Sequence, residues 1–262
     1  MLHTAQVLLA ADSVPRRMTR PGVKVGICGF AKSQATLFRT LRLLEIQQTF
    51  YKPPKVETAA AWRAKAPQDF EFTAKAWQLI THEPTSPTYR KAGIRVPEET
   101  RDRYGSFRPT DEVFDAWART KAVCAAMRAT VVVFQTPESF GPTPENKENM
   151  YAFFQGIGAP GIVCAWEPRG AWPLHVVERI CEDLGLQHAT DPFAMELVDQ
   201  PRAYYRLHGA PPGPTMYAYA YTDEDLRRIE GFCDEVDEAY VLFNNVTMYG
   251  DALRFLDRRA QR

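Results

Sequence analysis

Ionisable side chains alternate with apolar ones in several short β-branched or aromatic runs of this sequence of 262 residues. The charged members of these runs, with those just beyond them, are Glu45, Lys75, Glu167, Arg169, Arg206 and His208. Carboxylates, amines and imidazoles at such positions can transfer protons, and guanidinium groups match phosphate or carboxylate oxygens in pairs. We therefore predict that the two arginines hold a ligand and that the other four residues are catalytic.

The runs that must position these residues are eight predicted strands, which are separated by segments of helical period. The predicted strands are Lys24 to Cys28, Leu43 to Thr49, Phe70 to Ala76, Thr130 to Gln135, Gly161 to Trp166, Leu186 to Ala189, Ala203 to Leu207 and Tyr240 to Asn244. Helices are predicted over Asp111 to Met127, over Pro173 to Leu184 and after a capping box at Thr222. Repeated units of this kind, with no GxGxxG after the first strand, favour a single closed (β/α)₈ TIM-type barrel over a doubly wound sheet.

The alternation within each strand indicates which side chains face the inside of such a barrel. In the second strand Leu44 and Ile46 share one parity, whereas Glu45, Gln47 and Thr49 share the other. The third, fifth and seventh strands repeat this pattern. Because the apolar parity must pack under the helices, the charged parity should point into the lumen, with its later members at the C-terminal mouth, where barrel active sites lie.

Charges inside a barrel are costly unless they are paired or neutralised by a ligand. One interpretation is a self-satisfied network, such as Lys75 with Glu45 and Arg206 with Glu167. The other is a polar pocket, in which three cations face two carboxylates and favour a small anionic ligand. Residue spacing alone leaves both interpretations open.

Two connections are long, one after the third strand (residues 77–109) and one after the seventh (residues 208–221). Loops of this size commonly form lids or binding surfaces, and packed insertions are the alternative. After the sixth strand, residues 192–200 leave room only for a reduced helix or a turn. Residues 1–22 are predicted to be a poorly ordered tail, and residues 23–262 to be the barrel domain.

Composition and charge narrow the class of protein. Hydrophobic residues make up 45% of the chain and charged residues 24%, as in ordinary globular proteins. With 32 basic and 32 acidic residues the formal net charge is zero, so no global field favours nucleic acid. The five cysteines are widely spaced, no zinc motif is present, and no apolar stretch is long enough to span a bilayer. We expect a cytoplasmic protein with buried thiols, no metal site and no membrane partner, and leave its cofactors and oligomeric state open.

Several longer motifs resemble those of the domain of unknown function 72 family (YecE-like). In chain order they are GICGF, LEIQQTFYKPP, FEFTAKAWQLITH, VVVFQTPESF, AWEPRGAW, YYRLHG and VLFNN. The resemblance extends from Val25 to the last predicted helix, and it implies a (β/α)₈ barrel without an established activity. This chain has Gln47-Gln48 where the family commonly has Asn-Ser, Gly170 where it has His, and Phe30 where Trp is usual.

The resemblance also implies further ligand-binding residues, beyond the six charged ones above. They are Thr49, Tyr51, His82, Gln135, Asp191, Asn244 and Asn245.

The leading hypothesis is a barrel that binds or acts on a small anionic ligand, phosphorylated or carbohydrate-like. An alternative, by analogy with metal-dependent endonuclease barrels, is a nucleic-acid phosphodiesterase. Its metal ligands would be Glu45, Glu167, Asp191, His82 and His208. Arg and Lys in the same pocket would repel a divalent ion, which disfavours this alternative. A third hypothesis is a non-catalytic ligand sensor or partner protein.

A basic patch in the first long loop keeps contact with nucleic acid open as a hypothesis. It comprises Arg90, Lys91, Arg95, Arg101, Arg103 and Arg108, with Tyr89 and Tyr104 among them. The favoured interpretation is a solvated loop whose basic charges offset Glu98, Glu99 and Asp102.

Overall fold

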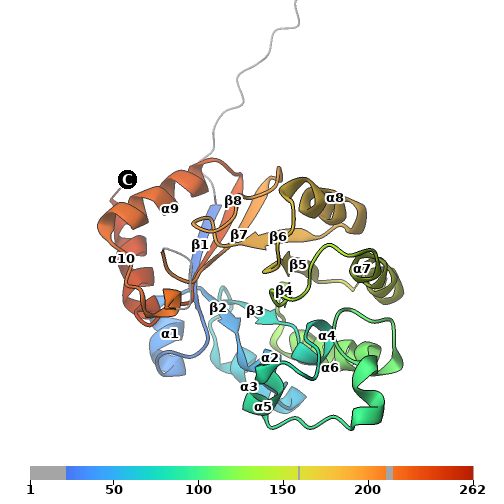
Figure 1. The fold of residues 1–262 in the computed structure, drawn as a ribbon. Helices are drawn as coiled ribbons and strands as arrows, with labels where there is room; N and C mark the ends of the chain where they lie inside the picture. Colours follow the sequence, from blue (N-terminus) through green and yellow to red (C-terminus); the bar gives the residue numbers. More distant parts are fainter. Residues whose placement is uncertain (1–21, 159, 211–214, 262) are drawn as a thin grey trace, which may run out of the picture.

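Eight parallel strands close into a barrel in which each strand pairs with the next along the chain and β8 pairs with β1 (Figure 1). The structure, a computed structural model, describes residues 22–158, 160–210 and 215–261. The strands are β1 (Gly22–Cys28), β2 (Leu43–Ile46), β3 (Glu71–Lys75), β4 (Val131–Gln135), β5 (Val163–Glu167), β6 (Gln187–Thr190), β7 (Arg202–Leu207) and β8 (Glu238–Phe243). The predicted (β/α)₈ fold is confirmed.

Helices surround the barrel on its outer side (Figure 1). The α-helices are α1 (Gln34–Thr40), α2 (Gln48–Tyr51), α3 (Val56–Lys65), α4 (Gln78–Thr81), α5 (Pro87–Ala92), α6 (Asp111–Met127), α7 (Pro144–Ile157), α8 (Leu174–Leu184), α9 (Asp223–Asp234) and α10 (Met248–Ala260). Two 3₁₀ turns lie in the predicted long connections, η1 (Glu98–Arg103) after β3 and η2 (Met216–Ala218) after β7. Among the described helices, none is long and apolar enough to cross a membrane.

Helix ends follow the local chemistry of the sequence. The predicted capping box is present at α9, where the Thr222 hydroxyl accepts from the backbone N–H of Asp225 and the Asp225 carboxylate accepts from that of Thr222. Helix α8 ends at Gly185, whose positive φ of 63° suits glycine. Pro173 is the N-cap of α8 and not, as predicted, its first residue.

Two hydrophobic layers confirm the parity argument. Lumen-facing residues such as Leu43, Val133 and Leu242 form a small apolar cluster inside the barrel. Residues of the other parity, such as Phe72 and Trp166, pack between the sheet and the helices in the larger cluster. The five cysteines are free and buried in these layers, as expected. The lumen therefore holds hydrocarbon along part of its length, and its charged side chains are gathered elsewhere.

A cluster of polar side chains closes the N-terminal end of the barrel. Lys24 Nζ lies 2.9 Å from Glu71 Oε2 and 3.1 Å from Glu238 Oε1, and it donates to the Tyr240 hydroxyl at 3.0 Å. The carboxylates and the hydroxyl raise the pKa of Lys24 despite its burial. This end of the lumen is therefore occupied by protein groups, which leaves the C-terminal end for a ligand.

The predicted end of the second strand needs correction. Strand β2 ends at Ile46 and not at Thr49, because the Thr49 hydroxyl donates to the Ile46 carbonyl at 2.8 Å and the chain turns into α2. The alternation therefore does not extend to Thr49 or Tyr51. The predicted tail of residues 1–22 lies outside the described residues up to residue 21, and Gly22 already pairs with Glu238 in the sheet.

The sixth unit lacks a helix, in agreement with its predicted reduction. Residues 191–201 form turns between β6 and β7, and the Asp191 carboxylate accepts from the backbone N–H of Phe193 at 3.1 Å. The segment of residues 77–109 contains α4, α5 and η1, and α5 contacts α2. Both features leave irregular chain beside the C-terminal ends of the strands.

Close packing of β1 against β2 explains why the first residue of the GICGF motif, Gly26, is a glycine. A Cβ atom at Gly26 would lie 2.4 Å from the backbone oxygen of Leu43 on β2. We expect Gly26→Ala to lower the free energy of unfolding by about 1–3 kcal/mol, the usual cost of overpacking. Gly22→Ala is the matched control, because a Cβ there meets nothing within 4 Å. Equal stability of the two variants in urea unfolding would contradict this packing argument.

Candidate functional site

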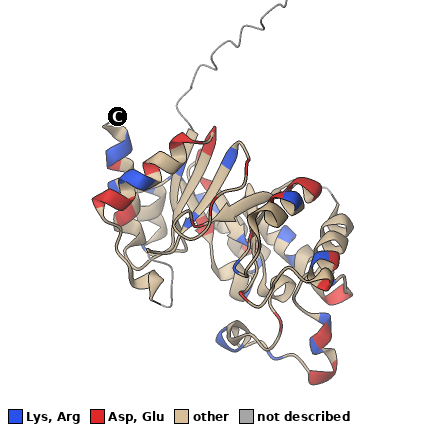
Figure 2. Ribbon diagram, turned by 45° about the horizontal axis from the view of Figure 1, so that its top comes forward, with Lys and Arg blue, Asp and Glu red and all other residues tan. Residues whose placement is uncertain are grey.

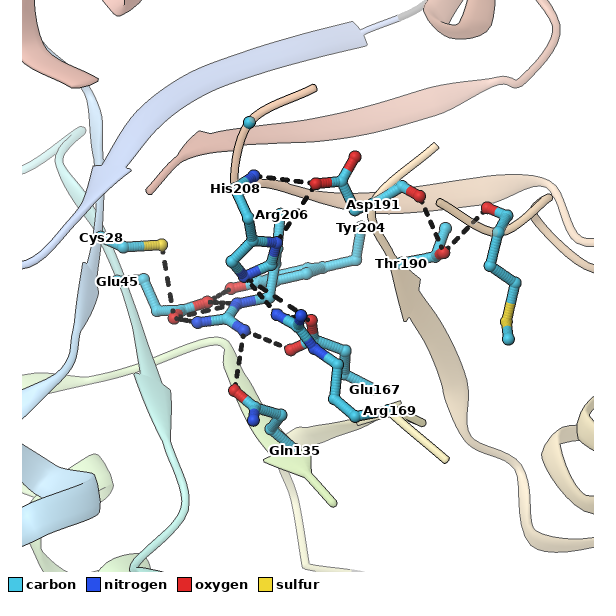
Figure 3. A network of polar contacts seen from close by, with 12 residues as sticks. Cys28, Glu45, Gln135, Glu167, Arg169, Thr190, Asp191, Tyr204, Arg206 and His208 are labelled. Atoms are coloured by element: carbon cyan, nitrogen blue, oxygen red, sulfur yellow. Dashed lines mark hydrogen bonds and ion pairs between the residues drawn. The ribbon is translucent and has the colours of Figure 1, made fainter. Parts of the chain in front are cut away.

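Arg206 joins three strands across the C-terminal part of the lumen (Figure 3). Its side chain comes from β7 and is fully buried. The guanidinium donates to Glu45 of β2, with Nη2 2.7 Å from Oε1 and Nε 3.1 Å from Oε2. Its Nη1 donates to Glu167 Oε2 of β5. One cation thus bridges two carboxylates and fixes their separation.

Further donors complete the surroundings of Glu45. The Tyr204 hydroxyl donates to Glu45 Oε2 at 2.8 Å and lies 2.8 Å from the Thr73 hydroxyl. The Gln47 amide also donates to Glu45 Oε1, and the Cys28 sulfur lies 3.5 Å from the same oxygen. Both carboxylate oxygens of Glu45 are therefore engaged by donors of the network.

The positive charges around Glu167 determine its protonation. Burial alone would raise its pKa, but the Arg169 and Arg206 guanidinium groups outweigh burial and hold the pKa of Glu167 well below its usual range. Arg169 Nη2 lies 2.8 Å from Glu167 Oε1. Glu167 is therefore a carboxylate at neutral pH, and it lines the cavity at the end of β5.

His208 forms a dyad with Asp191 at the ends of β7 and β6. Asp191 Oδ2 accepts from the backbone N–H of His208 at 2.8 Å and lies 3.3 Å from its Nδ1. On the other side of the ring, Arg169 Nη2 lies 2.6 Å from Nε2. A guanidinium can only donate, so Nε2 is the acceptor and the proton is on Nδ1. Burial also lowers the pKa of His208, so its imidazole is neutral at neutral pH.

A cavity of ≈ 620 Å³ opens at this end of the barrel. Of the predicted residues, those that line it are His82, Gln135, Glu167, Arg169 and Asp191. Among the described residues, Arg169 is the one arginine that lines this cavity, and its side chain is 21% exposed. Its Nε is buried and, among the described residues, has no hydrogen-bond partner. This N–H group is therefore not used by the protein groups of the described chain and can donate to a ligand.

Lys75 is buried at the end of β3 without the predicted pairing to Glu45. Its ammonium lies 3.6 Å from the centre of the Phe50 ring, and no ion pair to it occurs within the described residues. Burial, followed by the charge of Arg206, lowers the pKa of Lys75 to about 7, although Glu167 and Glu45 oppose this. The Arg206–Glu167 pair of the predicted network is present. Lys75 is thus poised to gain or lose a proton near neutrality.

His82 lines the cavity with a neutral imidazole ring. Its Nδ1 lies 2.8 Å from the Thr81 hydroxyl, and its ring packs edge-on against Phe50 at 4.9 Å. Burial, with the charge of Lys75, lowers the pKa of His82 to about 3. It can therefore contact a ligand but carries no charge at neutral pH.

Four residues implied by the family resemblance lie away from the cavity lining. Thr49 donates to the backbone oxygens of Ile46 and Lys75 and so holds the β2–α2 turn. Tyr51 contacts Lys91 at the surface. The described structure places Asn244 as a half-buried residue after β8 and Asn245 in hydrogen bonds to loop groups, including Tyr219 and Asp251. These four do not join the charged group in the described structure.

The structure adds residues that the sequence did not single out. Tyr217, from the connection after β7, lines the cavity and packs edge-on against His208 at 5.5 Å. Ser86 and Thr88 line it from the connection after β3. Both connections were predicted to lie at the C-terminal face as lids, binding surfaces or packed insertions, but their residues have no strand alternation that would single them out. Gly170 also lines the cavity, and a Cβ there would lie 2.5 Å from the Phe140 carbonyl oxygen.

The donor set does not fit a metal ion. Within residues 22–158, 160–210 and 215–261, no group of three or more His, Cys, Asp and Glu side chains is arranged to hold one. The space between Glu45 and Glu167, where a divalent ion would bind, is filled by the Arg206 guanidinium. A guanidinium and a metal ion would compete for the same carboxylate oxygens.

The fold and the site define a (β/α)₈ barrel with a polar cavity at the C-terminal ends of its strands. A family model described as "Protein of unknown function DUF72" matches residues 34–262. The chain belongs to this family, as the motif resemblance predicted. It is a TIM-barrel family of unknown function.

Solved structures of the family share this fold. A DUF72 family protein from Thermotoga maritima is 20% identical, with a TM-score of 0.63 over 91% of this chain and 99% of that chain. Another from Enterococcus faecalis is 17% identical, with a TM-score of 0.67 over 92% and 98%. A xylose isomerase domain containing protein from Salmonella typhimurium is 11% identical, with a TM-score of 0.58 over 93% and 97%. Comparison with curated proteins found no match.

Replacement of Arg206, the cation that bridges Glu45 and Glu167, should strongly destabilise the protein. Arg206→Met leaves Glu45 and Glu167 buried without their shared partner, and we expect a loss of about 3–5 kcal/mol in the free energy of unfolding. The control is Arg227→Met, which removes an exposed ion pair to Glu224 and should change stability by about 0.5 kcal/mol or less. Urea unfolding at neutral pH measures both, and Arg206→Met stability equal to that of the control would contradict the bridge.

The pKa of Lys75 predicts how stability depends on pH. Its pKa is about 7 in the folded chain, against 10.5 for an unperturbed lysine, so between these values the unfolded state binds more protons and stability rises with pH. Lys75→Met removes this penalty, and its stability relative to wild type should be about 2–3 kcal/mol more favourable at pH 6 than at pH 9. The exposed Lys121→Met on α6 should show no such difference. A pH-independent effect of Lys75→Met would refute the lowered pKa.

Proposed function

We propose that this chain binds and acts on a small anionic ligand, phosphorylated or carbohydrate-like, in the cavity at the C-terminal end of the barrel. The observation that carries the proposal is the buried, unpartnered Nε of Arg169, within the described residues. A phosphate or carboxylate oxygen is the acceptor that a guanidinium fork matches best. Arg169 would hold the anionic group of the ligand.

The rest of the cavity lining suits hydroxyl groups. Its carboxylates are Glu138, Glu167 and Asp191, and Gln135 adds an amide. The predicted excess of cations is therefore absent from the described lining, since Glu138 and Asp191 add carboxylates and neither Arg206 nor Lys75 belongs to it. A ligand with one anionic group and several hydroxyls satisfies such a mixed surface better than a polyanion does.

Proton transfer to or from the ligand would use the Asp191–His208 dyad. His208 is neutral, and its Nε2 accepts from Arg169. An anion that draws the Arg169 guanidinium toward the cavity would release Nε2 to accept a proton, while Asp191 stabilises the imidazolium through Nδ1. Glu167, whose Oε1 lies 3.7 Å from Nε2, would stabilise the same charge.

The fold supports a carbohydrate-like ligand at the level of architecture. The structural neighbour from Salmonella typhimurium is described as containing a xylose isomerase domain. A barrel of this type is therefore compatible with sugar binding, although the residues that would bind it here are those of this chain.

A thermal-shift screen of sugar phosphates, sugar acids and neutral sugars tests the proposal. We expect the phosphorylated or acidic members to stabilise the wild-type protein, and Arg169→Gln to weaken the binding of a hit by about tenfold or more. The control is Arg179→Gln, an exposed arginine on α8, which removes the same charge elsewhere.

Two results of this screen would contradict the proposal. One is stabilisation by neutral sugars alone, and the other is equal affinity of the Arg169→Gln and Arg179→Gln proteins. Turnover of a hit that is lost in His208→Gln supports catalysis, whereas tight binding without any turnover would identify a ligand sensor instead.

A further inference from the structure

A second cavity, of ≈ 550 Å³, lies within the segment that connects β3 to α6. It is enclosed by the part of this segment that contains α5 and η1, and its charged residues in the described chain are Arg90, Arg95 and Arg101. No carboxylate belongs to its described lining. The first cavity carries mixed charge, so the two cavities differ in the groups that they can bind.

The arginines of this segment fall into two kinds. Arg103 pairs with Glu112 at 3.1 Å, and Arg108 pairs with Glu83 at 2.8 Å while it donates to the Tyr104 carbonyl. These two arginines hold the segment together.

The arginines of the other kind, Arg90, Arg95 and Arg101, line the second cavity. Among the described residues, no ion pair involves Arg90, Arg95 or Arg101, although Glu98, Glu99 and Asp102 are close in sequence. The expected offset of basic by acidic charge thus does not take the form of ion pairs. Three guanidinium groups remain available around one hollow.

The two cavities adjoin at Ser86, which lines both. Ser86 caps α5, since its hydroxyl accepts from the backbone N–H of Thr88, and Thr88 lines the first cavity. The two cavities are therefore neighbours at the start of α5.

We propose that the second cavity is a phosphate-binding subsite for the far end of the ligand that occupies the first cavity. Guanidinium forks bind phosphate oxygens bidentately, and three of them around one hollow match a group of two negative charges. The inference rests on the proposed function, and it narrows the ligand to a small molecule with anionic groups at both ends, such as a sugar bisphosphate.

A polynucleotide suits this surface less well. Binding along a nucleic-acid backbone requires a continuous basic track. The segment at the lower edge of Figure 2 carries acidic and basic residues side by side, and Glu98, Glu99 and Asp102 are all exposed. The arginines form a compact group and not a track.

Titration calorimetry with inorganic phosphate, fructose 6-phosphate and fructose 1,6-bisphosphate tests the subsite. The test variant is Arg95→Gln/Arg101→Gln, and the control is Arg179→Gln/Arg227→Gln, which removes the same charge from other surfaces. We expect the bisphosphate to bind wild type more tightly than the monophosphate, by about tenfold, and the test variant to lose this advantage. The control should keep it.

The variant Arg169→Gln separates this inference from the proposed function. Inorganic phosphate should still bind Arg169→Gln, and that binding should be lost when Arg95→Gln/Arg101→Gln is added. This result supports the subsite even if Arg169→Gln has no effect on sugar phosphates and the proposed function fails.

Three results would overturn the subsite. The first is phosphate binding that Arg95→Gln/Arg101→Gln leaves unchanged, and the second is equal affinity of wild type for the two sugar phosphates. The third is salt-sensitive binding of a single-stranded oligonucleotide, lost in the same variant, together with no binding of either sugar phosphate.

Discussion

The bridge from Arg206 to Glu45 and Glu167 is the interaction on which the site depends. A charged group inside a barrel must be matched by opposite charge and hydrogen bonds, and here one guanidinium satisfies two carboxylates from β2 and β5. Because Arg206 is engaged in this way, it organises the site, and Arg169 is the arginine that lines the cavity in the described chain. The bridge also fills the place where a metal ion would bind.

The lumen changes in character along its axis. Lys24 and its carboxylates occupy the N-terminal end, aliphatic side chains such as Val133 and Leu242 occupy part of the interior, and the Arg206 network occupies the C-terminal end. The hydrocarbon separates the two polar ends, so the field that acts on Lys75 and His208 comes from their own neighbours. Burial is the largest cause that shifts both Lys75 and His208 toward their neutral forms.

Strand alternation was sufficient to predict the barrel and the buried charged residues on its strands. Glu45, Glu167 and Arg206 belong to regular strands, where a period of two fixes the direction of each side chain. The method was wrong at Thr49, because a hydroxyl bond to the backbone ends the strand before the alternation does. It also could not find the partner of Lys75, which is the face of Phe50, or the cavity residues of irregular loops, since neither follows a period.

Asp191 connects the turn between β6 and β7 to the histidine of the site. One carboxylate oxygen accepts from Phe193 within the turn, and the other accepts from His208. A regular helix at this point would leave the turn independent of the dyad. Here a shift of the turn would move the carboxylate that accepts from His208, so the position of the imidazole depends on this short stretch of chain.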